Sequence, residues 1–169
     1  ELLTTQSSLA LRTDPLPLPP AAGLVEQRAV HFAYPSRPDT PVFKGFDLQV
    51  NPGEKVALVG PSGAGKTTVF QLLQRFYDPT EGSVLLDGVD LRDADLKALR
   101  ARIALVPQDP VIFAASVRDN VRYARPDASD EQVVAACEAA FALEFINQLP
   151  DGLDTYLGER GLRLSGGQK

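Results

Sequence analysis

The stretch Gly60-Pro61-Ser62-Gly63-Ala64-Gly65-Lys66-Thr67-Thr68 decides how the rest of this chain is interpreted. It matches the pattern G-x-x-x-x-G-K-[ST] at every fixed position. Glycines allow the backbone to turn so that successive N–H groups point inward at an anion, with no Cβ in the way. Lys66 would place its charge on the β- and γ-phosphates, and the Thr67 hydroxyl would ligate Mg²⁺. The stretch therefore predicts a nucleotide-phosphate site.

The residues on either side of this loop fit the same prediction. Residues 54–59 end in the apolar run Val56-Ala57-Leu58-Val59, which is typical of a buried parallel strand. After the loop, Val69, Leu72, Leu73 and Phe76 fall at the spacing of one helix face. A helix that begins at the loop adds its dipole to phosphate binding.

Composition narrows the class of protein. A length of 169 residues predicts one domain, and a net charge of −5 disfavours a nucleic-acid surface, which needs clustered Lys and Arg. No apolar run is long enough to span a bilayer. The single cysteine, Cys137, cannot form an internal disulfide, and we interpret it as a small core hydrophobe.

Patterns before and after the loop predict a linker, several strands and a turn. Residues 13–20 are rich in proline and are expected to be an extended linker. Alternating apolar residues over 30–34 and 46–50 predict antiparallel strands, and the apolar run 103–106 predicts another strand. Asp87-Gly88 predicts a hairpin turn.

Helices are predicted in the second half of the chain. Ser116 and Ser129 are each followed three residues later by Asp or Gln, so both are expected to begin helices. An apolar stripe from Val134 through Phe141 to Leu149 predicts a long helical stretch after Ser129.

A second glycine motif stands near the end of the chain. Ser165, Gly166, Gly167 and Gln168 follow Leu164, and adjacent glycines after a serine predict a second anion-binding nest.

With both motifs in view, the chain resembles the nucleotide-binding domain of exporter-type ATP-binding cassette (ABC) transporters, from about Val25 to the last residue. In the family's order, Tyr34 matches the aromatic residue that stacks on adenine, Gly60 to Thr68 match Walker A, and Gln108 matches the Q-loop. Residues 158–161 are similar to the X-loop, and Leu164 to Gln168 spell the signature motif.

The resemblance implies a fold, a domain division and a set of site residues. The fold is an α/β P-loop NTPase-type core with an antiparallel β subdomain and an α-helical subdomain, C-terminally incomplete. Residues 1–24 would be a linker from an upstream membrane region, and residues 25–169 a partial ATP-binding domain. Nucleotide contacts are expected from Tyr34, Gly60, Pro61, Ser62, Gly63, Ala64, Gly65, Lys66, Thr67, Thr68 and Gln108, with Thr67 and Gln108 serving Mg²⁺.

The resemblance also implies a function and partners. ATP and Mg²⁺ would be the cofactors, and Ser165, Gly166, Gly167 and Gln168 would contact the ATP held by a second nucleotide-binding domain, in a homo- or heterodimer. A transmembrane domain fused upstream would place the domain at the cytoplasmic face of the membrane, and no nucleic acid is expected as a partner. ATP binding and hydrolysis would then drive export of a substrate that this sequence does not identify.

Part of the family pattern is missing. The Walker B aspartate, the catalytic glutamate and the switch histidine would follow Lys169, and the chain contains only His31, upstream of the loop. Lys66 and Gln108 would assist catalysis, but the chain as given is expected to be inactive alone. Two alternatives stay open: an ABC-type ATPase without a transport role, and a nucleotide-binding fragment without turnover. An unrelated P-loop kinase or GTPase would leave residues 164–168 unexplained.

Overall fold

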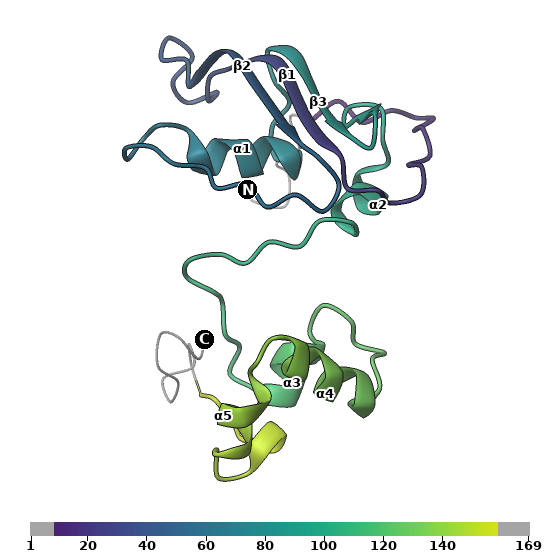
Figure 1. The fold of residues 1–169 in the computed structure, drawn as a ribbon, viewed down its shortest axis with the longest axis vertical. Coiled ribbons are helices and arrows are strands. Elements are labelled where there is room, and N and C mark those ends of the chain that lie inside the picture. The colour runs from purple at the N-terminus through teal and green to yellow at the C-terminus, as the bar shows by residue number, and fades with distance from the viewer. Residues whose placement is uncertain (1–8, 159–169) are drawn as a thin grey trace, which may run out of the picture. The chain divides into compact units, whose positions relative to one another are not determined.

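The computed structural model describes residues 9–158. The chain forms two compact units, Glu1–Leu105 and Val106–Lys169, and each is described by itself (Figure 1). Within the described range, no helix combines the length and the apolar character needed to cross a membrane.

The first unit is built on an antiparallel sheet with the strand order β2-β1-β3-β4. The strands are β1 (Val25–Phe32), β2 (Phe43–Val50), β3 (Glu81–Leu86) and β4 (Val89–Asp90). Val25 of β1 pairs with Val50 on one side and with Leu86 on the other, so β1 is a central strand. Both alternating segments are antiparallel strands, as predicted, and they pair with each other.

The turn between β3 and β4 has the conformation that its sequence predicts. Leu86 pairs with Val89, and the two residues between them, Asp87 and Gly88, have φ values of 51° and 80°. Positive φ at both central positions is the type I′ geometry that Asp-Gly favours.

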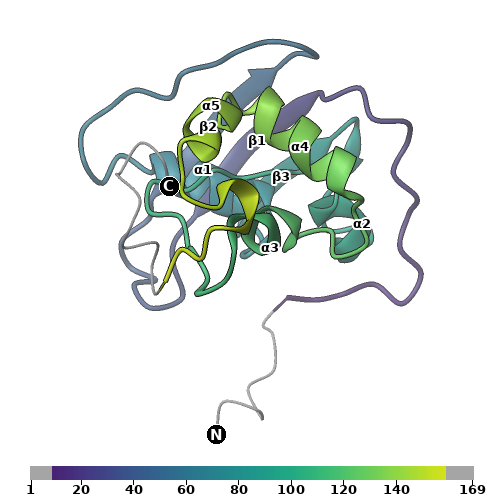
Figure 2. The same cartoon turned by 90° about the horizontal axis from the view of Figure 1, so that it is seen from below.

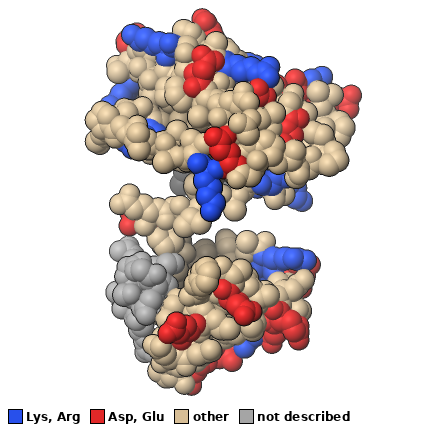
Figure 3. Space-filling model, viewed as in Figure 1, with Lys and Arg blue, Asp and Glu red and all other residues tan. Residues whose placement is uncertain are grey.

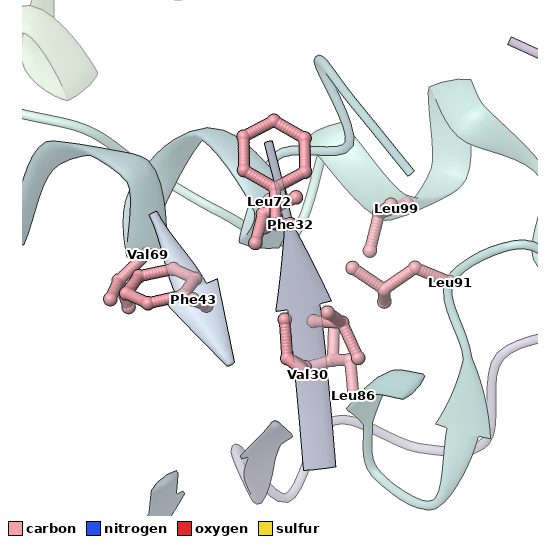
Figure 4. Close-up of a cluster of buried hydrophobic side chains, with 9 residues drawn as sticks. Val30, Phe32, Phe43, Val69, Leu72, Leu86, Leu91 and Leu99 are labelled. Carbon is pink, nitrogen blue, oxygen red and sulfur yellow. The ribbon is translucent and has the colours of Figure 1, made fainter. Parts of the chain in front are cut away.

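One helix covers a face of this sheet and positions the loop of interest. Helix α1 (Lys66–Leu73) begins directly after Gly65. Val69 and Leu72 of α1 are buried, and they pack in one apolar cluster with Phe43 of β2 and Val30 of β1 (Figure 4). Burial of this apolar face, rather than helix propensity, holds an eight-residue helix in place.

The predicted apolar face extends to Phe76, which lies beyond the end of α1. The helix ends at Leu73, and Arg75 adopts a left-handed φ of 51°. The amides of Arg75 and Phe76 bond back to the carbonyls of Leu72 and Gln71, which is the Schellman pattern of helix ends. Phe76 is therefore half exposed, and the Arg100 guanidinium lies over its ring.

Two predicted strands do not form among the described residues. Residues 54–59 and 103–106 belong to no strand, and Val59 and Val106 are 88% and 93% exposed. A strand exists only where a neighbour accepts and donates its backbone hydrogen bonds, and neither run has such a neighbour in the described part of the chain. Both runs therefore have the apolar sequence of a strand but lack the backbone hydrogen bonds of a sheet.

Residues 10–24, which we call the strap, run along the first unit in an extended path. Leu16 forms a parallel bridge to Ala94, just before the short helix α2 (Leu96–Arg100). Charged side chains of the unit also bind the strap. Arg75 donates to the Ala10 carbonyl, and Arg102 donates to the Leu18 and Pro19 carbonyls. Asp87 accepts from the amides of Ala22, Gly23 and Leu24.

The second unit is a cluster of short helices (Figure 2). They are α3 (Val117–Arg122), α4 (Asp130–Ala139), α5 (Leu143–Asn147) and the 3₁₀ helix η2 (Gly152–Asp154). Their shared core consists of five buried side chains, those of Val117, Val133, Cys137, Ile146 and Leu157. Cys137 is thus a core residue, as expected, and burial raises the pKa of its thiol.

Both predicted helix starts are confirmed. Ser116 precedes α3, and its hydroxyl accepts the Asp119 amide at 3.1 Å. Ser129 and Gln132 form a complete capping box at the start of α4, in which each side chain accepts the other residue's amide.

The apolar stripe predicted over the helical stretch after Ser129 does not lie on one continuous helix. Helix α4 ends at Ala139, and Phe141 has a φ of 55° and is 93% exposed. The amides of Phe141 and Ala142 bond to the carbonyls of Glu138 and Cys137, which closes α4 with a second Schellman motif. The chain then turns into α5, so the stripe is divided between two helices.

Candidate nucleotide site

The glycine-rich loop lies at the N-terminal end of α1. Gly65 is the residue before the helix and has a φ of 87°. A Cβ at this position would lie 2.7 Å from Phe43 Cε1 and 2.8 Å from Val42 Cγ1. Both the backbone conformation and the close approach to the start of β2 therefore require glycine at position 65.

The side chain of Lys66 folds back over the loop. Its Nζ donates hydrogen bonds to the carbonyl oxygens of Gly60 and Pro61, each at 2.7 Å. These partners are neutral, and an ammonium binds the charged oxygen of a phosphate more strongly than a neutral carbonyl. The loop thus holds a cation that a phosphate could take over with little rearrangement of the backbone.

The start of α1 can serve an anion in addition to Lys66. No side chain caps the helix at Gly65, so the first-turn amides of α1 are not occupied by a capping oxygen. The dipole of the helix makes this end electropositive. Thr67, in the first turn, is exposed.

A hollow of about 380 Å³ adjoins the loop. Its lining comes from the loop, from the first turn of α1 and from the segment between β1 and β2: Tyr34, Val42, Ser62, Gly63, Gly65, Lys66, Thr67 and Thr68. Lys66 is the one charged residue of this lining. The hollow is therefore suited to a ligand that carries negative charge at one end.

Tyr34 lines this hollow and is half buried. Its ring meets the rings of Phe32 and Tyr77 edge-on, with centroids 5.0 Å and 5.4 Å from that of Tyr34. Its hydroxyl contacts Thr68 Oγ1 at 2.7 Å and donates to Gln71 Oε1 at 2.5 Å. The ring is thus anchored to α1 at one end, and stacking on a base stays a prediction.

Thr68 has a different environment from Thr67. Thr68 is 4% exposed, and its hydroxyl is engaged by Tyr34. Of the two threonines, Thr67 has the accessible hydroxyl and Thr68 can offer a ligand its backbone amide.

The described residues fit a Mg²⁺ ion only as a companion of a phosphate ligand. No group of three or more His, Cys, Asp or Glu side chains in the described range could hold a metal ion. Mg²⁺ in nucleotide sites is held by one or two protein oxygens together with phosphate oxygens and water. The exposed Thr67 hydroxyl is a suitable oxygen of this kind.

The other predicted site residues come later in the sequence. Gln108 is exposed and belongs to the second unit. Ser165, Gly166, Gly167 and Gln168 lie outside the described residues, as do residues 159–161 of the X-loop. Their roles stay predictions.

Sequence reasoning missed two residues of the hollow's surroundings. Val42 lines the hollow beside Gly65, and Gln71 binds the Tyr34 hydroxyl. Gln71 lies one helical turn after Thr67, so its position on the loop side of α1 was available from helix periodicity. Its partner, 37 residues away, was not.

The second unit has a hollow of another character, about 210 Å³ in volume. Its lining is apolar apart from Asn120 and the Cys137 thiol. It offers no cation to a phosphate.

On the face seen in Figure 3, acidic and basic side chains alternate over the first unit without a continuous basic patch. The acidic balance of the chain is visible on the second unit, where acidic side chains predominate. The expectation that nucleic acid is not a partner stays a prediction.

Loop, helix and hollow together have the geometry of a P-loop nucleotide-binding fold. The family model described as ABC transporter matches residues 43–169. The chain therefore belongs to the ABC transporter family, and the resemblance drawn from its motifs is confirmed.

Individual relatives agree with this assignment. The chain is 53% identical over 152 residues to an ATP-dependent lipid A-core flippase of Chromobacterium violaceum, covering 90% of this chain and 26% of the flippase. It is 48% identical over 148 residues to ABC transporter B family member 3 of Dictyostelium discoideum, covering 88% of this chain and 10% of that protein. The chain thus spans between a tenth and a quarter of the length of these relatives.

A solved structure supports the fold. The chain matches a bacterial Atm1-family ABC exporter with ATP bound, with a TM-score of 0.92 and 42% sequence identity. The match covers 99% of this chain and 29% of the exporter chain. The predicted fold class, an ABC-type ATPase domain with an antiparallel sheet and helices, is confirmed.

Proposed function

We propose that this chain is the ATP-binding domain of an ABC exporter, in which ATP binding and hydrolysis drive transport across a membrane. The observation that supports it most directly is the loop 60–68, where Lys66 bridges two loop carbonyls at the open N-terminal end of α1. The relatives named as an exporter and a flippase support the transport role.

In this proposal each loop residue has one task. Lys66 leaves the Gly60 and Pro61 carbonyls and binds the β- and γ-phosphates, while the amides of the loop and of Thr68 bind their remaining oxygens. Mg²⁺ neutralises phosphate charge, and the Thr67 hydroxyl is its oxygen ligand from this loop. Tyr34 supplies a ring on which the adenine stacks.

The loop contributes to the reaction by electrostatics. Phosphoryl transfer needs donors and cations that are in place before charge develops on the transferred group. Lys66 is held in advance, so it reaches the phosphates without a large reorganisation. Gln108 is proposed to orient Mg²⁺ and its water molecules.

Partners complete the proposed assembly. Residues 165–168 of one domain contact the ATP bound to the loop of a second domain, so a two-fold pair closes two sites together. Residues 1–24 connect the domain, residues 25–169, to a transmembrane region, and the domain works at the cytoplasmic face of the membrane.

The test is Mg-ATP binding by the full chain, measured by isothermal titration calorimetry. Lys66→Ala removes a charged hydrogen bond of about 1.5–3 kcal/mol, so we expect the affinity to fall at least about tenfold. Lys97→Ala, which removes an exposed charge of α2 in the same unit, is the matched control and should leave the affinity unchanged. Equal binding by wild type and Lys66→Ala would contradict the proposal.

A further inference from the structure

The Tyr34 hydroxyl is held by two side chains of α1. It lies 2.7 Å from Thr68 Oγ1 and 2.5 Å from Gln71 Oε1. Thr68 is buried, and Tyr34 and Gln71 are half buried, so these hydrogen bonds are shielded from competing water. They connect the segment after β1 to the helix that begins at the phosphate loop.

The hydrogen count fixes the direction of these bonds. The Tyr34 hydroxyl has one proton, and it is donated to Gln71 Oε1. The Thr68 hydroxyl must therefore donate to the Tyr34 oxygen. The chain of donors runs from Thr68 through Tyr34 to Gln71, and its end point is an amide oxygen that only accepts.

The ring of Tyr34 is restrained at its sides as well. Its plane stands at 77° to that of Phe32 and at 90° to that of Tyr77. These aromatic contacts limit the tilt of the ring, while the hydroxyl contacts limit how far it can move from α1. Tyr34 also lines the hollow beside the loop.

We propose that Gln71 is a positioning residue, which holds the Tyr34 ring at a set distance from the phosphate loop and so selects ligands that carry a base at the matching distance from their phosphates. This inference rests on the proposed nucleotide site. Gln71 acts through Tyr34 and touches no part of the ligand. Because Gln71 and Thr67 lie on the same helix, the Tyr34 ring and the phosphate loop keep a fixed distance from each other.

A purely structural role for the Gln71 contact makes a different prediction. If the contact only stabilised the packing of α1 on the sheet, its loss would weaken every ligand of the loop alike. A positioning role affects the base and spares the phosphates. The ratio of affinities for ATP and for inorganic tripolyphosphate, each as the Mg²⁺ complex, separates the two roles.

The experiment compares these two ligands on the full chain by calorimetry. We expect Gln71→Leu to lower the affinity for ATP about three- to tenfold, the worth of one hydrogen bond, and to change that for tripolyphosphate less than twofold. Gln71→Glu keeps an acceptor oxygen at the same reach and should retain most of the ATP affinity. Gln74→Leu, the same substitution at the residue that caps α1, is the control and should change neither affinity.

Tyr34→Phe closes the cycle. It keeps a ring for stacking but removes the hydroxyl, so Gln71→Leu should have no further effect on ATP affinity in this background. Additive losses, equal losses for both ligands, or no loss with Gln71→Leu would each overturn the inference while the nucleotide site stands. Failure of the wild-type chain to bind either ligand would overturn the proposed function itself. Should Gln71→Leu not fold, Tyr34→Phe removes the same hydrogen bond from the other side, and it should lower the affinity for ATP while sparing that for tripolyphosphate.

Discussion

At the residue scale, the loop depends on a few positions where only one side chain fits. Gly65 is such a position because its left-handed φ and its contact with Val42 and Phe43 act together. Gly63 in the same loop has a similar φ of 83°, but nothing lies within 4 Å of where its Cβ would be. An alanine at position 63 would therefore suffer backbone strain alone, whereas an alanine at position 65 would suffer both strain and steric crowding.

We therefore predict that Gly65→Ala destabilises the chain more than Gly63→Ala. Gly63→Ala should cost about 1 kcal/mol, from the left-handed backbone alone. Gly65→Ala should cost about 1–3 kcal/mol more, because a methyl group must displace Phe43 or Val42. Urea unfolding, with an unchanged slope, measures the difference. Equal unfolding midpoints for the two variants would contradict the prediction, because Val42 and Phe43 would then make room for the methyl group at no measurable cost.

The carboxylate of Asp87 is a second residue with an unusual setting. Burial raises the pKa of this carboxyl, but hydrogen bonds from the amides of Leu24, Gly23 and Ala22 and the nearby Arg102 lower it by more, so the net shift is downward. Its side chain is 4% exposed. The ionised form is thus the one that the folded chain stabilises.

The sign of its pH dependence follows from that shift. A carboxyl with a lowered pKa in the folded chain contributes stability above its unfolded pKa, and this contribution is lost as the pH falls through the folded value. We predict that Asp87→Asn lowers the unfolding free energy by about 1–2 kcal/mol at pH 7 and that the deficit shrinks below about pH 4. Denaturant unfolding from pH 7 to pH 3 measures this. Asp39→Asn, in the exposed loop after β1, should show no such trend.

At the element scale, helix starts follow from the sequence better than helix ends. The start of α4 is predicted by a local pattern, Ser129 followed three residues later by Gln132, and the capping box forms as expected. The ends of α1 and α4 carry no such signal, because Arg75 and Phe141 occupy the left-handed position where glycine is usual. Both predicted apolar stripes overran their helices for this reason.

The start of α4 gives a prediction at this scale. Ser129→Ala removes the oxygen that accepts the Gln132 amide, and the expected loss is about 1 kcal/mol of unfolding free energy. Hydrogen exchange should show faster exchange at the amides of Gln132 and Val133. Ser36→Ala, in an exposed loop of the first unit, serves as the control. Unchanged protection in α4 would mean that the cap adds nothing measurable.

Strands depend on more than their own residues. The alternation over β1 and β2 was sufficient because each strand has its partner within the first unit. The runs 54–59 and 103–106 have equally apolar sequences, but the hydrogen bonds of a parallel strand come from neighbours on both sides. Apolar sequence predicts where a strand could lie, and its partners decide whether it forms.

At the scale of the whole molecule, the phosphate loop and its helix could be predicted because all their determinants lie within about twenty consecutive residues. The Tyr34–Gln71 contact could not, since it joins residues 37 positions apart and depends on how α1 packs on the sheet. Tyr34 was expected at the site on its motif alone. What fixes its ring became visible only in three dimensions.

The strap supplies hydrogen-bond partners to two charged side chains of the first unit. Arg75 is 1% exposed, and one of its hydrogen-bond partners is the carbonyl of Ala10, while the Asp87 carboxylate depends on three amides before Val25. A chain that began at the first strand would lack hydrogen-bond partners for both the buried Arg75 guanidinium and the buried Asp87 carboxylate. A shortened version of this protein should therefore keep the strap, from Ala10 onward, although its proline-rich sequence resembles a dispensable linker.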